Sequence, residues 1–150
     1  GSINGVITIK GKQGHAAYPE KSINPIHQLA TVFHKMAGVD LDDGDEHFAP
    51  SKFVVTDIRS GMEVTNVTPS ELRMMFNVRN NTLTTQKEVR EFVDTHLGKY
   101  DYELTLTQGS YPFKTSTDTN IVSSIDRAIF EVTSIRPKYS TAGGTSDARF

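Results

Sequence analysis

The chain has 150 residues, of which 36% are hydrophobic and 23% are charged, as expected for a soluble globular domain with its own core. A formal net charge of -2 does not provide the basic surface that nucleic-acid binding needs, and no apolar run is long enough to cross a membrane. The absence of cysteine excludes disulfides and thiolate metal sites, and the chain shows no signal peptide. We therefore expect a cytoplasmic protein with neither a nucleic-acid nor a membrane partner.

The first part of the chain predicts a strand, a loop and a helix. Residues 3–10 are rich in β-branched side chains and end at a glycine, as strands do. The glycines and the proline of residues 11–19 indicate a loop. Asn24 is expected to cap a helix that begins at Pro25 and ends at Gly38. The apolar residues of this helix recur at helical spacing and predict its buried face: Ile26, Leu29, Ala30, Phe33, Met36 and Ala37.

An acidic segment follows the predicted helix, with five carboxylates between residues 40 and 50. Clustered carboxylates can bind calcium, but the spacing is not that of an EF-hand and no glutamate closes the loop at the required position. We therefore interpret this segment as a solvated surface loop.

The middle of the chain predicts two more strands, a second helix and a fourth strand. Residues 52–59 and 71–79 are expected to form a hairpin with a long loop, and the second of these strands alternates apolar and polar residues. Thr85 and Glu88 have the form of a capping box at the start of a helix. Residues 100–107 alternate again. The order β-α-β-β-α-β predicts an α+β, ferredoxin-like domain, with a four-stranded antiparallel sheet and both helices on one face.

Residues 109–150 fall outside that unit. A linker precedes a predicted helix over residues 118–134, and an extended piece over 138–141 leads into a glycine turn. This order is typical of α/β architecture, so we expect a first domain over 1–113 and a fragment of a second over 114–150, with the helix's apolar stripe left bare. The start without methionine and the end after the turn indicate that the chain is a fragment.

The sequence contains no complete active site. None of its five histidines has a neighbour at metal-ligand spacing. His15 lies in a loop between small residues, where it could approach a ligand or be an ordinary loop histidine. The glycine turn at 143–147 could hold an anion through its N–H groups or be a simple tight turn. Arg79, at a strand end, could bind an anionic substrate or be solvated.

Three motifs together resemble one family, the co-catalytic di-zinc aminoacylases and carboxypeptidases. Gly-Lys-Gln-Gly-His-Ala-Ala-Tyr-Pro at 11–19 is similar to the entry of the family's lid domain. Glu-Val-Thr-Asn-Val-Thr-Pro at 63–69, followed by Phe-Asn-Val-Arg at 76–79, is similar to the hairpin of that domain. Thr-Ala-Gly-Gly-Thr-Ser-Asp-Ala-Arg-Phe at 141–150 is similar to the substrate-binding turn of the catalytic domain.

The resemblance implies a mechanism for a longer parent enzyme. Two zinc ions would activate a water that attacks an amide carbonyl, and a glutamate would act as general base. His15 matches the lid histidine that stabilises the oxyanion from the partner subunit. The positions that match substrate contacts are Ser2, Tyr18, Asn66, Arg79, Gly144 and Thr145. Thr65 replaces an asparagine that the family often carries.

The resemblance also implies what this chain lacks and what it pairs with. The metal ligands and the general base lie in family segments outside residues 1–150, so we expect the chain to bind no zinc and to hydrolyse nothing. A homodimer is implied, formed through the lid domain's first helix and a sheet edge. The motifs favour a succinylated amino acid as the substrate of the parent, and an acetylated amino acid or a peptide is the alternative. A non-enzymatic ferredoxin-like binding module is a further alternative.

Overall fold

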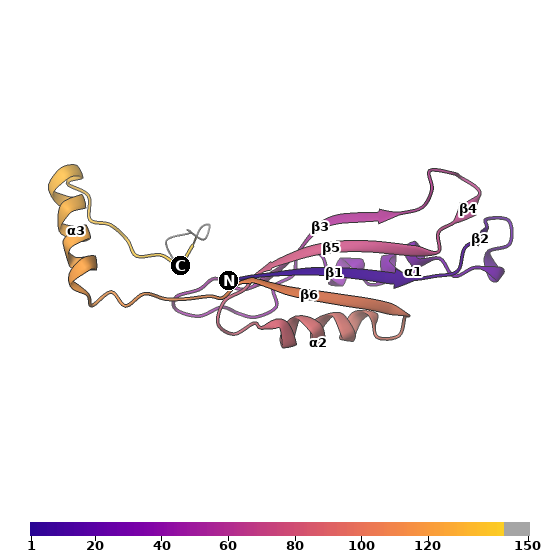
Figure 1. Cartoon of the computed structure of the whole chain (residues 1–150), viewed down its shortest axis with the longest axis horizontal. Coiled ribbons are helices and arrows are strands. Elements are labelled where there is room, and N and C mark those ends of the chain that lie inside the picture. Colours follow the sequence, from indigo (N-terminus) through magenta and orange to yellow (C-terminus); the bar gives the residue numbers. More distant parts are fainter. Residues whose placement is uncertain (143–150) are drawn as a thin grey trace.

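The computed structural model describes residues 1–142, and its elements follow the predicted order (Figure 1). The strands are β1 (Ser2–Lys10), β2 (Gly14–His15), β3 (Lys52–Ser60), β4 (Val67–Thr68), β5 (Glu71–Arg79) and β6 (Tyr102–Ser110). The α-helices are α1 (Pro25–Ala30), α2 (Gln86–Leu97) and α3 (Asn120–Thr133). Two short 3-10 helices are η1 (Pro19–Lys21) and η2 (Phe33–Lys35).

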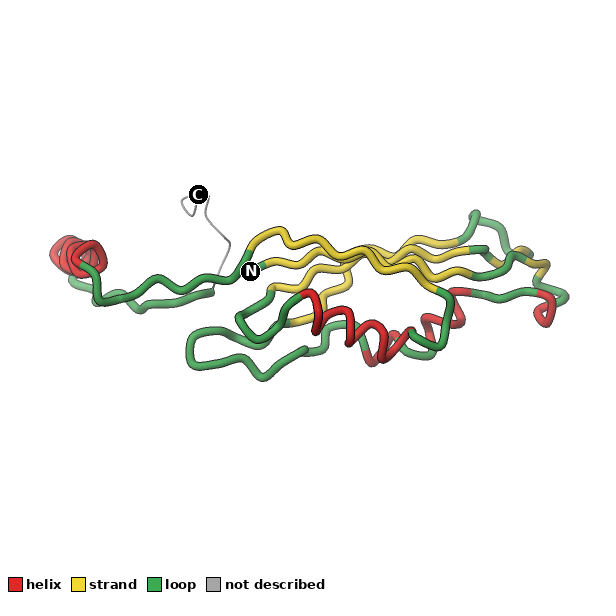
Figure 2. The backbone as a smooth tube through the Cα atoms, turned by 60° about the horizontal axis from the view of Figure 1, so that its bottom comes forward, coloured by secondary structure: helices red, strands yellow, loops and turns green. Residues whose placement is uncertain are grey.

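Four long strands form one antiparallel sheet in the order β3-β5-β1-β6. Helices α1 and α2 lie against the same face of this sheet, as Figure 2 shows. The predicted α+β, ferredoxin-like arrangement is therefore confirmed. The two remaining strands, β2 and β4, pair with each other in a small ribbon beyond one end of the sheet.

The core lies between the sheet and the two helices. Strand β5 alternates as predicted, with one side of the strand buried and the other facing away from the helices. A strand places successive side chains on opposite faces, so one apolar set from each strand meets the helices. The buried hydrophobic residues are Ile3, Ile7, Ile9, Leu29, Val32, Met36, Phe53, Leu72, Met74, Phe76, Val78, Val89, Val93 and Leu97.

The core leaves no room for a side chain at Gly5. Gly5 is paired with Phe76 across β1 and β5, and a Cβ built on Gly5 would overlap the Phe76 ring. That ring stacks on Phe53, with centroids 4.2 Å apart. An aromatic ring thus covers the bare backbone of a glycine in the neighbouring strand.

We expect Gly5→Ala to lower the free energy of unfolding by about 3 kcal/mol, because the Phe76 ring must leave its stack to admit the methyl group. Urea unfolding followed by circular dichroism measures the change. Ala16→Gly, at an exposed position outside the core, is the control and should cost less than about 1 kcal/mol. A Gly5→Ala variant as stable as the unsubstituted chain would contradict this account of the packing.

The first helix differs from its prediction. The regular helix ends at Ala30 instead of continuing to residue 37, and a turn and η2 complete the segment. The Thr31 hydroxyl donates back to the Gln28 carbonyl oxygen at 2.8 Å, a bond that competes with the regular helix pattern. Val32, after the turn, is buried, whereas Ile26 and Ala30, expected in the core, lie away from the buried Pro25 and Leu29 side of the helix and are exposed.

The acidic segment also differs, because one of its carboxylates is a structural hub. Asp42 accepts hydrogen bonds from the backbone N–H groups of Gly44 (2.7 Å) and Ser51 (3.2 Å). It also accepts from the Asn81 amide at 2.6 Å and from the Thr84 hydroxyl. Burial alone would raise the pKa of Asp42, but these hydrogen bonds outweigh it and lower the pKa to about 2. The segment is therefore a folded loop fastened to the β5–α2 connection.

The C-terminal part contains the predicted helix as α3, capped by the Thr119 side chain, which accepts from the Val122 N–H. Its apolar stripe is bare as predicted, with Ile121 72% and Val132 86% exposed. Residues 138–142 show no strand, because an extended segment becomes a strand only beside a pairing neighbour. No helix of the described part of the chain is long and apolar enough to cross a membrane.

Candidate substrate-binding site

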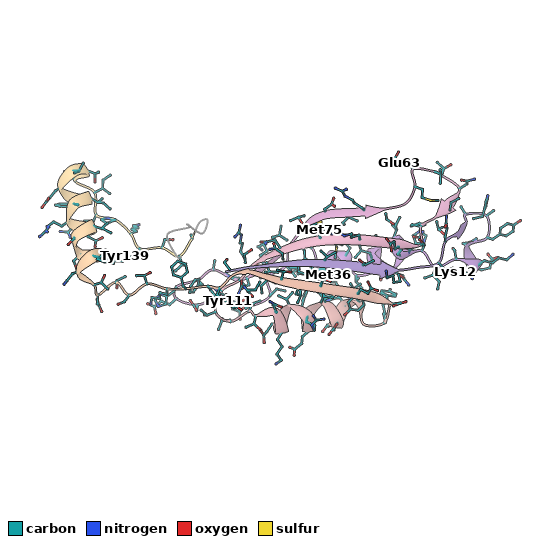
Figure 3. The ribbon with its side chains drawn as sticks, viewed as in Figure 1. Lys12, Met36, Glu63, Met75, Tyr111 and Tyr139 are labelled. Atoms are coloured by element: carbon teal, nitrogen blue, oxygen red, sulfur yellow. The ribbon has the colours of Figure 1, made fainter. Side chains whose placement is uncertain are left out.

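The site residues predicted from the sequence fall into two groups at opposite ends of the sheet. His15, Tyr18 and Asn66 lie around the β2–β4 ribbon, which we call the tip. Ser2 and Arg79 lie at the other end, where β1 begins and β5 ends. In Figure 3 the labels Lys12 and Glu63 mark the tip, and Tyr111 and Tyr139 mark the opposite end.

The tip brings together residues that are about fifty positions apart in the sequence. His15 pairs with Val67, and the Ala16 N–H donates to the Asn66 carbonyl oxygen at 2.9 Å. In the neighbouring pair of the ribbon, the Gly14 N–H donates to the Thr68 hydroxyl oxygen at 3.0 Å. His15 and Asn66 are both exposed and are therefore presented outward by the two-stranded ribbon.

The His15 ring has a defined orientation and tautomer. The Ala17 N–H donates to Nδ1 of His15 at 3.1 Å, so Nδ1 carries no proton in this arrangement. The neutral ring then carries its proton on Nε2, at the opposite corner of the imidazole. The Tyr18 ring lies beside it, with centroids 6.1 Å apart. His15 can therefore act as a hydrogen-bond donor to a group outside the tip.

The opposite end contains an arginine and a serine on neighbouring strands. Ile3 pairs with Val78, so Ser2 and Arg79 are the next residues along the two strands. Arg79 is exposed and lines a hollow of about 970 Å³ together with Gly1, His47 and Tyr139. Within residues 1–142 Arg79 forms no ion pair, so its guanidinium group can take an anionic ligand.

Ser2, in contrast, is only 9% exposed and is held by two amide side chains. Nδ2 of Asn77 donates to the Ser2 hydroxyl oxygen at 3.0 Å. Nε2 of Gln108 approaches the Ser2 carbonyl oxygen at 3.3 Å and donates to the Ser110 carbonyl oxygen at 2.6 Å. These contacts link the strands at which the main chain enters and leaves the sheet.

The two groups are too far apart to act on one small ligand within a single chain. An antiparallel strand rises about 3.4 Å per residue, so β1 separates Ser2 from Lys10 by about 27 Å, and the tip lies beyond Lys10. A small substrate bound by Ser2 and Arg79 is therefore out of reach of the His15 ring of the same domain.

Gly144 and Thr145 lie outside the described residues. Among residues 1–142 no three histidine, cysteine or acidic side chains are placed to hold a metal ion, so the described residues do not fit a zinc site. The sequence reasoning did not single out Asn77 or Gln108. The sequence could have indicated Asn77, because it lies two residues before Arg79 in a predicted strand and therefore on the same face.

The chain is matched over residues 1–105 by the family model of the peptidase dimerisation domain (M20_dimer), and it belongs to this family. It is 70% identical over 149 residues to the succinyl-diaminopimelate desuccinylase of Sulfurimonas denitrificans, a match that covers 99% of this chain and 41% of that protein. It is 66% identical over 150 residues to the protein of the same name from Nautilia profundicola, covering 100% of this chain and 41% of the relative. The chain thus spans about two fifths of the length of these relatives.

Among solved structures, the fold is similar to that of an M20 family metallo-carboxypeptidase, Sso-CP2 from Sulfolobus solfataricus. The TM-score is 0.68 at 14% identity, and the match covers 91% of this chain and 44% of that one. At this identity the likeness concerns the fold alone. It agrees with the ferredoxin-like sheet and helices described above.

Proposed function

We propose that this chain is the lid, or dimerisation, part of a zinc-dependent amidohydrolase that cleaves N-succinyl-LL-2,6-diaminopimelate to succinate and LL-2,6-diaminopimelate. The observation that carries the proposal is the 70% identity over 149 residues to a succinyl-diaminopimelate desuccinylase. In this proposal residues 1–113 are the lid domain and residues 114–150 belong to the catalytic domain. The parent enzyme is cytoplasmic, and the chain by itself hydrolyses nothing.

The residues of this chain have two tasks in the proposed reaction. Attack on the succinyl amide carbonyl creates an oxyanion, and a donor aimed at that oxygen lowers the barrier. His15 supplies such a donor through its Nε2–H, because Nδ1 is occupied by the Ala17 N–H. Substrate binding is the task of Ser2, Tyr18, Asn66, Arg79, Gly144 and Thr145, with the guanidinium group of Arg79 opposite a substrate carboxylate.

Two zinc ions in the parent enzyme would supply the activated water for this reaction. Since residues 1–142 do not fit a zinc site, the ligands would come from outside those residues. The lid residues act around the reacting carbonyl and at the substrate carboxylates.

The separation between the two groups, which exceeds the length of β1, about 27 Å, supports a homodimer. If Ser2 and Arg79 bind the substrate of their own subunit, the oxyanion donor must come from the tip of another chain. A two-fold symmetric pair provides this twice, because each tip then serves the site of its partner. The homodimer is thus part of the proposed catalytic arrangement.

We further propose that the subunits pair through the β3 edge together with the α1 side of the domain. Strands β3 and β6 are the two edges of the sheet. Strand β3 exposes Val54 (43%) and Ile58 (42%), and Ile26 of α1 is 43% exposed, whereas the exposed positions of β6 include Glu103, Thr105 and Thr107. Apolar residues at an open edge favour pairing with another strand.

Val54→Lys with Ile58→Lys is therefore expected to raise the dimer dissociation constant at least about tenfold, because charged side chains at an edge oppose strand pairing. Light scattering across a concentration series measures the dissociation constant. Thr105→Lys with Thr107→Lys places the same charges at the β6 edge and should leave it unchanged. Weakened association in the β6 variant alone would assign the interface to the other edge.

The substrate is tested by comparing N-succinyl-LL-2,6-diaminopimelate with acetylornithine as substrates of the complete zinc-loaded enzyme. The proposal expects kcat/KM for the succinylated substrate to be higher by at least about a hundredfold, because Arg79 and its neighbours would bind carboxylates absent from the acetylated compound. Comparable turnover of both compounds, or a preference for acetylornithine, would replace the proposed substrate. Hydrolysis by the isolated chain would overturn its assignment as an inactive part.

A further inference from the structure

Asn77 lies between two polar side chains of the neighbouring strand, on the sheet face that carries no helices. It is paired with Asn4 across β5 and β1. Its Nδ2 donates to the Asn4 side-chain oxygen at 2.9 Å and to the Ser2 hydroxyl oxygen at 3.0 Å. Asn77 therefore connects the strand that ends in Arg79 to the first residue of β1.

The hydrogen count of this arrangement determines what the Ser2 hydroxyl can do. An amide nitrogen has two hydrogens, and both are used, one by Asn4 and one by Ser2. The hydroxyl oxygen of Ser2 accepts one of these, so its own proton is directed elsewhere. The Ser2 backbone is fixed as well, since Gln108 contacts the Ser2 carbonyl oxygen.

Arg79 lies close to this hydroxyl, at the end of the neighbouring strand. Residues 77 and 79 share one face of β5, and Ser2 follows Ile3, the partner of Val78. The hydrogen bond from the Asn77 side chain shows that the Ser2 side chain lies on that same face. A guanidinium group and an oriented hydroxyl donor thus occupy adjacent strand ends, an arrangement suited to the two oxygens of one carboxylate.

We propose that Asn77 is a positioning residue that keeps the Ser2 hydroxyl as a hydrogen-bond donor for a substrate carboxylate held by Arg79. The inference rests on the proposed function, in which Ser2 and Arg79 bind substrate. Asn77 does not touch the substrate and acts only through Ser2. An acceptor at position 77 would take the Ser2 proton for itself and leave the substrate without this donor.

The test is a double-mutant cycle in the complete zinc-loaded enzyme, with N-succinyl-LL-2,6-diaminopimelate as substrate. Ser2→Ala is expected to raise KM about tenfold with kcat nearly unchanged, as loss of one hydrogen bond to a charged group would. Asn77→Leu should raise KM to a similar extent, and adding it to Ser2→Ala should change nothing further. Asn77→Asp, which keeps the shape but offers only acceptors, should raise KM at least as much. Asn4→Ala removes the other partner of Asn77 and should leave KM within about twofold.

The outcomes separate this inference from the function on which it rests. Thermal unfolding of each variant shows whether a change in KM comes from misfolding, and Asn77→Asp replaces Asn77→Leu if the latter is unfolded. Ser2→Ala with a raised KM but Asn77 variants with the wild-type KM would overturn the positioning role alone. Additive effects of Ser2→Ala and Asn77→Leu would overturn it too. A wild-type KM in Ser2→Ala would remove Ser2 from the site, and absence of desuccinylase activity in the unaltered enzyme would overturn the proposed function itself.

Discussion

Replacing His15 by alanine in the complete enzyme is expected to lower kcat by about 100- to 1,000-fold, with KM changed only a few-fold. The oxyanion forms only in the transition state, so its donor contributes to kcat more than to substrate binding. The structure favours a donor role because Nδ1 of His15 accepts from the Ala17 N–H and directs the remaining ring proton outward. Steady-state kinetics with the succinylated substrate measures both constants.

His96→Gln is the matched control, because His96 lies on α2, which packs beside β6, away from the tip and from the proposed β3 and α1 interface. It should leave kcat within about twofold, because the side chain contacts neither the site nor the interface. A His15→Ala enzyme with unchanged kcat and a strongly raised KM would show that the ring binds substrate and does not stabilise the oxyanion.

Mixing two inactive variants tests whether His15 acts across the dimer. His15→Ala and Arg79→Ala each damage every site of their own homodimer. In a mixed dimer one site combines an intact Arg79 with the partner's intact His15, so an equal mixture should recover about a quarter of the wild-type activity. If His15 served its own subunit, each site of the mixed dimer would contain one defect, and the mixture would stay inactive.

The second large effect is expected from Asp42. Asp42→Ala should lower the free energy of unfolding by about 3 kcal/mol, because the substitution leaves the N–H groups of Gly44 and Ser51 and the side chains of Asn81 and Thr84 without their shared acceptor. Urea unfolding at neutral pH measures the loss. Asp43→Ala, at the exposed neighbouring carboxylate, should change the stability by less than about 0.5 kcal/mol.

The pH dependence of the free energy of unfolding shows whether Asp42 stabilises the fold through its charge or through its packing. The pKa of Asp42 is lowered from 3.8 to about 2 in the folded chain, so the folded state binds this proton less readily than the unfolded state. The resulting stabilisation, about 2 kcal/mol, is complete above pH 5 and is lost as the pH falls through the folded pKa of about 2. The stability difference between the parent chain and Asp42→Asn should therefore shrink between pH 5 and pH 2. A stability difference that stays constant over this pH range would show that the ionised form of Asp42 is not what stabilises the fold.

Local patterns were sufficient to predict the sheet and its helices. The alternation Leu72, Met74, Phe76, Val78 belongs to a strand buried on one side, and the capping box of Thr85 and Glu88 starts the second helix as predicted. Both signals lie within a few residues of sequence, where backbone geometry alone decides the spacing. The lid motif around His15 was recognised in the same way, from adjacent residues.

The errors of prediction arose where distant contacts outweigh a local pattern. Ile26 fits the apolar stripe of its helix but is exposed, because α1 buries the side that carries Pro25 and Leu29 and ends at Ala30, where the Thr31 hydroxyl contacts that of Tyr100, some seventy residues away. Asp42 belongs to a segment with the composition of a solvated loop, yet it accepts hydrogen bonds from the side chains of Asn81 and Thr84, some forty residues away. Neither contact leaves a periodic trace in the sequence.

The sequence by itself determined the element order, the fold class and the residues that resemble a substrate site. The tertiary structure alone decided how those residues are grouped: His15 with Asn66 at the tip, and Ser2 with Asn77 and Arg79 at the far end of β1, more than about 27 Å away. The physical reason is that strand register is set by the collective fit of the core, so it joins residues at distances along the chain that no local pattern records.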